Sequence, residues 1–173
     1  MSQNEDESLQ APIKPRTLLS HDITYSAALA EDYNVLYELT YPEKRLEFYT
    51  RLFRRRKLIK TLVARHLGLN SIDECHVSHT EDWLHGTFNL CIRVDVHGKD
   101  KELKQQVMIR FPLPYRVGEG PCPGNSDEKI RCEAGTYAWL QENCPDIPIP
   151  RLHGFGLSTG KTVSNDHSGI SDD

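Results

Sequence analysis

The chain has 173 residues, of which 38% are hydrophobic, and a formal net charge of −4. It holds no run of about 18 apolar residues and no apolar segment after a basic start, so we expect neither a transmembrane helix nor a secretory signal. Its five cysteines are irregularly spaced and form no C-x-x-C pair, which favours reduced thiols and a cytoplasmic protein.

Both ends of the chain are polar. Residues 1–19 and 161–173 hold too few apolar side chains to offset the conformational entropy of ordering them. We therefore predict that both ends are disordered and that the folded part lies between them.

Residues 20–70 are predicted to form a helical leader. Ser20 can cap a short helix that ends before Pro42. A longer helix is expected from Pro42 to Leu67, with Gly68 just past its end, because proline is favoured at the first helical position and glycine after the last.

The longer helix carries a basic run, Arg54-Arg55-Arg56-Lys57. Such a run can bind nucleic acid or act as a nuclear localisation signal. However, apolar residues recur around it at helical spacing, which leaves the basic side chains largely on the other face. No aromatic platform for stacked bases accompanies the charges. We therefore favour a solvated helix face and rank nucleic-acid binding last among the alternatives.

Residues 71–160 change in character and predict three strands followed by a helix. The strands are expected at residues 75–80, 88–96 and 104–111, joined by turns as an antiparallel meander. The middle strand has the clearest pattern, since its apolar residues alternate on one face: Phe88, Leu90, Ile92, Val94 and Val96.

A helix is expected at residues 126–142, with Asn125 as its cap and Glu128 completing a capping-box arrangement. Residues 152–157 are predicted to form a last short strand. Two helices, three strands, one helix and one strand indicate an α+β fold.

Two charges lie in otherwise apolar patterns. Arg110 falls inside the strand Val107–Phe111, which we predict to be buried, and Glu133 falls within the apolar stripe of the following helix. A charge removed from water without a partner is costly. Arg110 and Glu133 should therefore meet each other or a ligand. From the pattern alone, a structural ion pair and a site for nucleotide phosphates both remain open.

The amino-acid sequences of several segments resemble those of the aminoglycoside phosphotransferase family, and of its large fungal branch most closely. These segments are GTFN at 86–89, VMIRFPLP at 107–114, DEKIRCEA at 127–134, YAWL at 137–140 and PIPRLHGFG at 148–156. The resemblance implies a protein-kinase-like small lobe over residues 71–160, an antiparallel sheet with one αC-type helix. It also implies ATP-dependent phosphoryl transfer to the hydroxyl of a small molecule.

The resemblance implies that four residues bind the cofactor. Arg110 resembles the strand cation that contacts the nucleotide phosphates, and Glu133 resembles its helix partner. Gly86 and Asn89 resemble the turn over the phosphates. Arginine replaces the lysine of protein kinases, and a guanidinium can contact phosphate as a bidentate donor. The turn lacks a full G-x-G-x-x-G pattern.

The cofactors that the resemblance implies are ATP and Mg²⁺. Phosphoryl transfer needs an H-x-D catalytic loop and an aspartate motif for the metal, which the family carries in its large lobe. No histidine here is followed two positions later by aspartate. We therefore expect a truncated protein without catalytic residues or Mg²⁺ ligands of its own, inactive alone and with an unknown substrate.

The alternative is a non-catalytic binding or regulatory module that associates, with itself or a partner, through an exposed apolar face of the sheet. A metal site is not expected. Cys75, His76, His79 and His85 lie near one another in the sequence, but their side chains would alternate between faces of a strand and do not complete a tetrahedral set.

Overall fold

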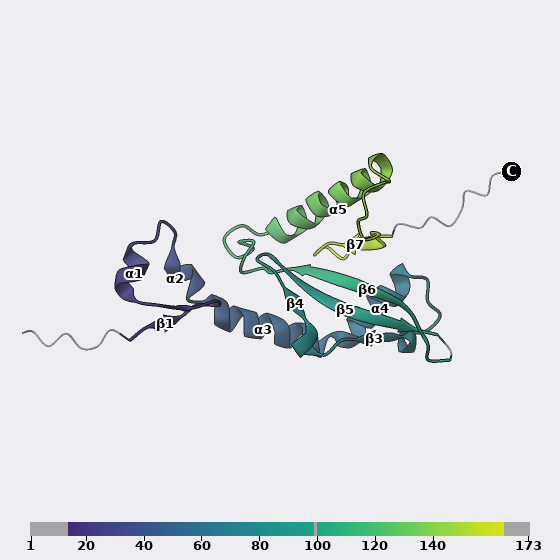
Figure 1. The fold of residues 1–173 in the computed structure, drawn as a ribbon, viewed down its shortest axis with the longest axis horizontal. Helices are drawn as coiled ribbons and strands as arrows, with labels where there is room; N and C mark the ends of the chain where they lie inside the picture. Colours follow the sequence, from purple (N-terminus) through teal and green to yellow (C-terminus); the bar gives the residue numbers. More distant parts are fainter. Residues whose placement is uncertain (1–13, 99, 165–173) are drawn as a thin grey trace, which may run out of the picture. The chain divides into compact units, whose positions relative to one another are not determined.

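The computed structural model describes residues 14–98 and 100–164. The chain divides into two compact units, one ending at Thr50 and one beginning at Arg51. Both contain helices and small antiparallel sheets, so the fold class is α+β, as expected (Figure 1). Among the described residues no helix is both long enough and apolar enough to cross a membrane.

The first unit is built from short elements. In chain order they are β1 (Arg16–Thr17), β2 (Asp22–Ile23), α1 (Tyr25–Leu29), α2 (Val35–Glu38) and the beginning of α3 (Tyr41–Arg54). The strands β1 and β2 pair antiparallel. The buried side chains of Leu18, Ile23 and Val35 form a small core, with Ala28 and Leu39 packed against it.

The ordered part of this unit begins earlier than predicted. Residues 1–13 lie outside the described residues, but Arg16 and Thr17 form a strand and Leu18 is 4% exposed. Ser20 caps no helix because it lies in the turn between the two strands, which is closed by the Leu18 N–H donating to the His21 carbonyl. The first helix is instead capped by Thr24, whose hydroxyl accepts from the Ala27 N–H.

The predicted long helix is interrupted. It consists of α3 and α4 (Arg56–His66), separated at Arg55, where φ is −101° and ψ is 19°. At the break the Arg56 Nε donates to the Phe53 carbonyl at 3.1 Å, and the guanidinium lies over the Phe53 ring. A side chain thus supplies the hydrogen bond that the next helical turn would have made, which is a recognised cause of helix interruption.

The second unit contains α4 and most of the sheet. Its other elements are η1 (Ile72–Glu74), β3 (Cys75–Val77), η2 (Thr80–Asp82), β4 (Leu84–His85), β5 (Asn89–His97), β6 (Leu103–Pro112), α5 (Asn125–Asn143), β7 (Gly154–Gly156) and β8 (Thr162–Ser164). The strands β3, β5 and β6 correspond to the three predicted strands and pair antiparallel, as expected, and β4 pairs with β5 within a segment where no strand was predicted. Because β6 pairs along the whole of β5, the strands β3 and β4 share the other edge of β5.

The central strand β5 supplies the core of this unit. Leu90, Ile92 and Val94 are fully buried and Val96 is 2% exposed, as the alternation predicts. Phe88 departs from the pattern and is 50% exposed, because it precedes the strand. The helix α4 contacts β3 and contributes buried side chains of its own, and Figure 1 draws it behind the sheet.

The strand β6 is less buried than predicted. Met108 is 50% exposed and the Arg110 side chain is 46% exposed. Within the described residues β6 pairs with β5 alone, so it is an edge strand with less covering than a central one. The prediction of a buried Val107–Phe111 strand is therefore wrong, although the strand itself is present.

Two boundaries near the C-terminal end also differ from prediction. The residue before α5 is Gly124, with φ at +102°, and Asn125 is the first helical residue rather than the cap. The predicted disordered end 161–173 begins with β8, which pairs antiparallel with β7. Residues 165–173 lie outside the described residues.

The end of α4 matches its prediction closely. Gly68 follows the C-cap residue and has φ at +63°. The Gly68 N–H donates to the Arg65 carbonyl and the Leu69 N–H to the Ala64 carbonyl, the pattern of a Schellman motif.

Gly68→Ala is expected to lower the free energy of unfolding by about 1 kcal/mol, because a left-handed backbone disfavours a Cβ atom. No heavy atom lies within 4 Å of a Cβ built at Gly68, so the backbone alone carries the cost. The control is Gly135→Ala within α5, where the surrounding space is equally open. There alanine should raise stability by about 0.5–1 kcal/mol. Thermal unfolding followed by circular dichroism measures both, and shifts of the same sign would contradict the assignment at Gly68.

Candidate functional site

The strand pairing of β5 and β6 places three polar residues on one face of the sheet. Cys91 lies opposite Arg110, and Asn89 lies opposite Pro112 at the end of the ladder. Since side chains alternate along a strand, Asn89, Cys91 and Arg110 share the face opposite to the buried side chains of β5. The helix α5, which contacts β6, brings Glu133 to this face.

Arg110, Glu133, Asn89 and Lys129 form a polar cluster, hereafter the Glu133 cluster. The Arg110 Nη1 lies 3.6 Å from the Glu133 Oε2. The Asn89 Nδ2 donates to the Glu133 Oε1 at 3.2 Å, and the Lys129 Nζ pairs with the same oxygen. The expected meeting of Arg110 and Glu133 is therefore present.

The cluster lies at a partly exposed position. The side chains of Arg110, Glu133 and Lys129 are 46%, 31% and 22% exposed, respectively. Ion pairs with this much solvent contact contribute little to stability, typically less than about 1 kcal/mol. Arg110 and Glu133 were expected to be buried charges that require a partner, but both are partly in contact with solvent. The guanidinium of Arg110 therefore stays accessible.

The charges of the cluster do not balance. Desolvation acts to raise the pKa of Glu133, but hydrogen bonds from Lys129 and Asn89 and the charges of Lys129 and Arg110 outweigh it. The pKa of Glu133 therefore lies below its usual value, and the carboxylate is ionised at neutral pH. Two cations around one carboxylate leave an excess positive charge that favours an anion.

The pKa of Arg110 is raised further above its ordinary value. Desolvation opposes this, but a hydrogen bond with the Cys91 thiol and the negative charge of Glu133 prevail. The guanidinium is thus a permanent cation with its carboxylate partner on one side.

The turn before β5 is only partly joined to the cluster. Asn89 is a member of it, and its Oδ1 is a buried atom without a hydrogen-bond partner among the described residues. Gly86 donates its N–H to the Asn89 carbonyl at 2.9 Å, so this amide is already used within the turn. A Cβ at Gly86 would meet only the Asn89 carbonyl, at 4.0 Å. Neither observation requires glycine at this position.

Two members of this neighbourhood were missed by the sequence predictions. Lys129 lies four residues before Glu133, a spacing at which helical side chains meet, so helix geometry alone could have found it. Cys91 could be placed beside Arg110 only once the strand register was known. Both follow from regular secondary structure.

Carboxylates hold the first turn of α5 in place. Glu119 accepts from the backbone N–H groups of Gly124 at 2.7 Å and Ser126 at 2.6 Å, and these bonds lower its pKa. Asp127 accepts from the Ser158 N–H at 2.8 Å and from its hydroxyl at 2.7 Å, which lowers the pKa of Asp127. These contacts anchor the helix that carries Glu133, and the second ties it to the turn between β7 and β8.

The Glu133 cluster fits a phosphate group better than a metal ion. It offers an accessible guanidinium, a primary amine and a positive charge balance. Its one carboxylate is already engaged by Lys129, Asn89 and Arg110, which leaves little to offer Mg²⁺. Over residues 14–98 and 100–164, no group of three or more His, Cys, Asp or Glu is arranged to hold a metal.

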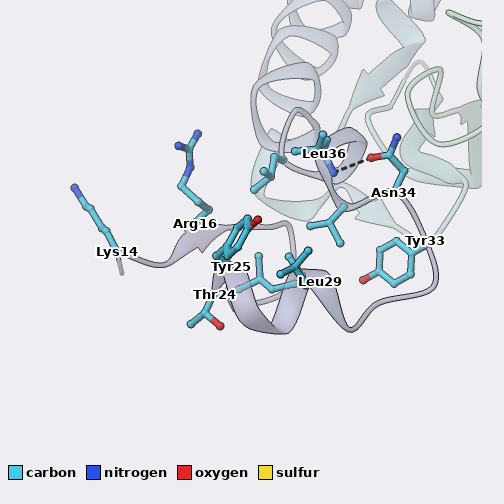
Figure 2. A pocket seen from close by; sticks show the side chains of 12 residues that line it. Lys14, Arg16, Thr24, Tyr25, Leu29, Tyr33, Asn34 and Leu36 are labelled. Atoms are coloured by element: carbon cyan, nitrogen blue, oxygen red, sulfur yellow. Dashed lines mark hydrogen bonds between the residues drawn. The ribbon is translucent and has the colours of Figure 1, made fainter. Parts of the chain in front are cut away.

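The first unit has a separate apolar concavity of about 360 Å³ (Figure 2). Tyr25, Leu29 and Leu36 line it and are 68%, 70% and 72% exposed. The lining side chains Thr24 and Asn34 are engaged in capping α1 and α2. The lining also includes the polar side chains of Lys14, Arg16 and Tyr33, but most of the surface that the concavity offers is apolar.

No protein-family model matches this chain, and neither the curated proteins nor the solved structures contain a match to it. The comparisons therefore assign no family, and the geometry of the Glu133 cluster is the basis for a proposed function.

Acid is expected to weaken the anchoring of α5. The pKa of Asp127 and of Glu119 is lowered in the fold, so their contribution to stability is present above the unfolded values of 3.8 and 4.5. It is lost as the pH falls through the lower folded values. Asp127→Asn should therefore lower the urea midpoint at pH 7. Near pH 3 the midpoints of the variant and the wild-type chain should lie closer together.

The control for this prediction is Asp146→Asn, since Asp146 is an exposed carboxyl just after the helix. Urea unfolding at several pH values, followed by tryptophan fluorescence, compares the three proteins. The anchoring role of Asp127 is contradicted if the two variants show the same dependence on pH.

Proposed function

We propose that the second unit is the nucleotide-binding small lobe of a protein-kinase-like fold, similar to that of aminoglycoside phosphotransferases. The observation that carries the proposal is the contact between a strand cation, Arg110, and a helix acid, Glu133, across β6 and α5. This pairing positions nucleotide phosphates in kinase-like folds. The resemblance of residues 86–89, 107–114 and 127–134 to that family supports the same conclusion.

Each member of the cluster has a role in this proposal. Arg110 binds phosphate oxygens through the N–H groups that Glu133 does not engage, and a guanidinium suits bidentate contact with phosphate. Glu133 orients the guanidinium. Lys129 and Asn89 hold the Glu133 carboxylate, so that it does not neutralise Arg110 completely.

The chemistry of the proposed family is the transfer of the γ-phosphoryl group of ATP to the hydroxyl of a small molecule. ATP supplies that group when bound. No described residue is assigned to Mg²⁺, and the sequence contains no H-x-D motif for positioning a hydroxyl. The role proposed for this chain is therefore to bind the nucleotide, and the acceptor is not specified by its residues.

Titration of the chain with ATP, followed by NMR, tests the proposal. The Arg110 side-chain signals and the backbone amides of residues 86–89 should shift in a saturable way. Arg110→Gln should weaken binding by about tenfold or more, because a hydrogen bond to a charged group contributes about 1.5–3 kcal/mol.

Arg93→Gln is a matched control for this titration. Arg93 lies on β5, the strand paired with that of Arg110. It also pairs with a carboxylate, and its side chain is 46% exposed, the same fraction as that of Arg110. It should leave ATP binding nearly unchanged. Equal loss in both variants would indicate non-specific attraction of a polyanion, and absence of ATP-dependent shifts at the cluster would leave a structural ion pair as its role.

A second proposal is a non-catalytic module that associates through the sheet. The apolar face of β5 does not supply the surface, because its side chains are buried. The exposed edge strand β6 supplies it instead, with Met108 half exposed. Exposed strand edges readily pair with another chain.

Sedimentation velocity over a range of concentrations tests association. A self-associating chain should show a sedimentation coefficient that rises with concentration, and Met108→Lys should reduce the rise. Ile147→Lys is the control, since Ile147 is 49% exposed but lies outside the sheet. A concentration-independent monomer would remove self-association from the proposal.

A further inference from the structure

Two histidines on neighbouring strands face each other. The Nδ1 atoms of His76 on β3 and His97 on β5 are 3.1 Å apart. Their ring centroids are 4.7 Å apart, and the rings are nearly perpendicular, at 84°. The nucleotide proposal does not involve either residue.

The strand register explains why the two rings meet. His76 pairs with Asp95, so His97 lies two residues further along β5 on the same face. Diagonal neighbours on an antiparallel pair are within reach of long or aromatic side chains. The adjacent residues point the other way, and Cys75, Val94 and Val96 are buried, which fixes the backbone beneath both histidines.

The separation of the two nitrogens suits a shared metal ion. With a bond of about 2.0–2.1 Å from zinc to imidazole nitrogen, two ligands are about 3.3 Å apart in a tetrahedral site and about 2.9 Å apart at right angles. The observed 3.1 Å lies between these values. The two nitrogens are hydrogen-bonded to each other, and a shared ion would take the place of that proton once both rings turn toward it.

We propose that His76 and His97 form a binding site for a divalent transition-metal ion that prefers imidazole, such as Zn²⁺ or Ni²⁺. The described residues place no third ligand beside the pair, so water completes the coordination and the ion exchanges readily. The neighbouring Asp95 is held by Gln106 and Arg93, both at its Oδ1, and the Arg93 charge balances its own.

A bound ion would join the short strand β3 to the end of β5. Because the site exists only when the two strands are paired, binding would stabilise the fold by mass action. The proposal thus assigns the histidine pair a metal-dependent effect on the stability of the second unit.

The experiment titrates the untagged chain with Ni²⁺ and Zn²⁺ by calorimetry and follows the histidine side chains by NMR. One equivalent should bind, the His76 and His97 signals should change first, and the melting temperature should rise. His76→Ala and His97→Ala should each weaken binding by at least about tenfold, since even the loss of an outer-sphere partner costs about 10–100-fold.

The controls are His79→Ala and His85→Ala, which remove two other exposed histidines of this unit. Both should retain the affinity of the wild-type chain. Circular dichroism without metal confirms that each variant is folded, and the NMR titration of the wild-type chain tests the site without any substitution. Unchanged affinity in His76→Ala and His97→Ala, or first changes at other histidines, would overturn the proposal.

Discussion

The alternation of side chains along β5 is the constraint on which the second unit depends. One face of this strand carries Leu90, Ile92 and Val94, which are fully buried. The opposite face carries Asn89 and, through the pairing with β6, Arg110. Because a strand has a period of two residues, the core and the polar face cannot be changed independently. The same register also brings His97 toward His76.

The position of α5 determines which charged groups surround Arg110 on the polar face of the sheet. Its first turn is held by the carboxylates of Glu119 and Asp127, and the turns that follow bring Glu133 to Arg110 and Lys129 to Glu133. An anion at the start of a helix is favoured by the unpaired N–H groups and the helix dipole. The helix is therefore fixed at one end by carboxylates, and this places a third carboxylate among two cations. Their unequal charge leaves Arg110 available to a negatively charged ligand.

The predictions succeeded where a local pattern was strong. The alternation of β5, the antiparallel meander and the end of α4 at Gly68 follow from residue order alone. Two of the failures arose where a side chain intervened. Arg56 caps the Phe53 carbonyl and interrupts a pattern that is otherwise helical, and Glu119, five residues before Gly124, replaces Asn125 as the cap of α5. Such contacts depend on chain geometry that residue spacing does not specify.

By itself, the sequence determined the α+β class and the apolar face of β5, because these depend on helical and strand periods. It also suggested that Arg110 meets Glu133, but from a cost of burial that the partly exposed pair does not bear. The tertiary structure decided how exposed that pair is, since β6 is an edge strand and its burial depends on neighbours rather than on its own residues. It also decided that Lys129 shares the Glu133 carboxylate and that His76 faces His97. Pairing register and packing are collective properties, and a pattern within one segment does not contain them.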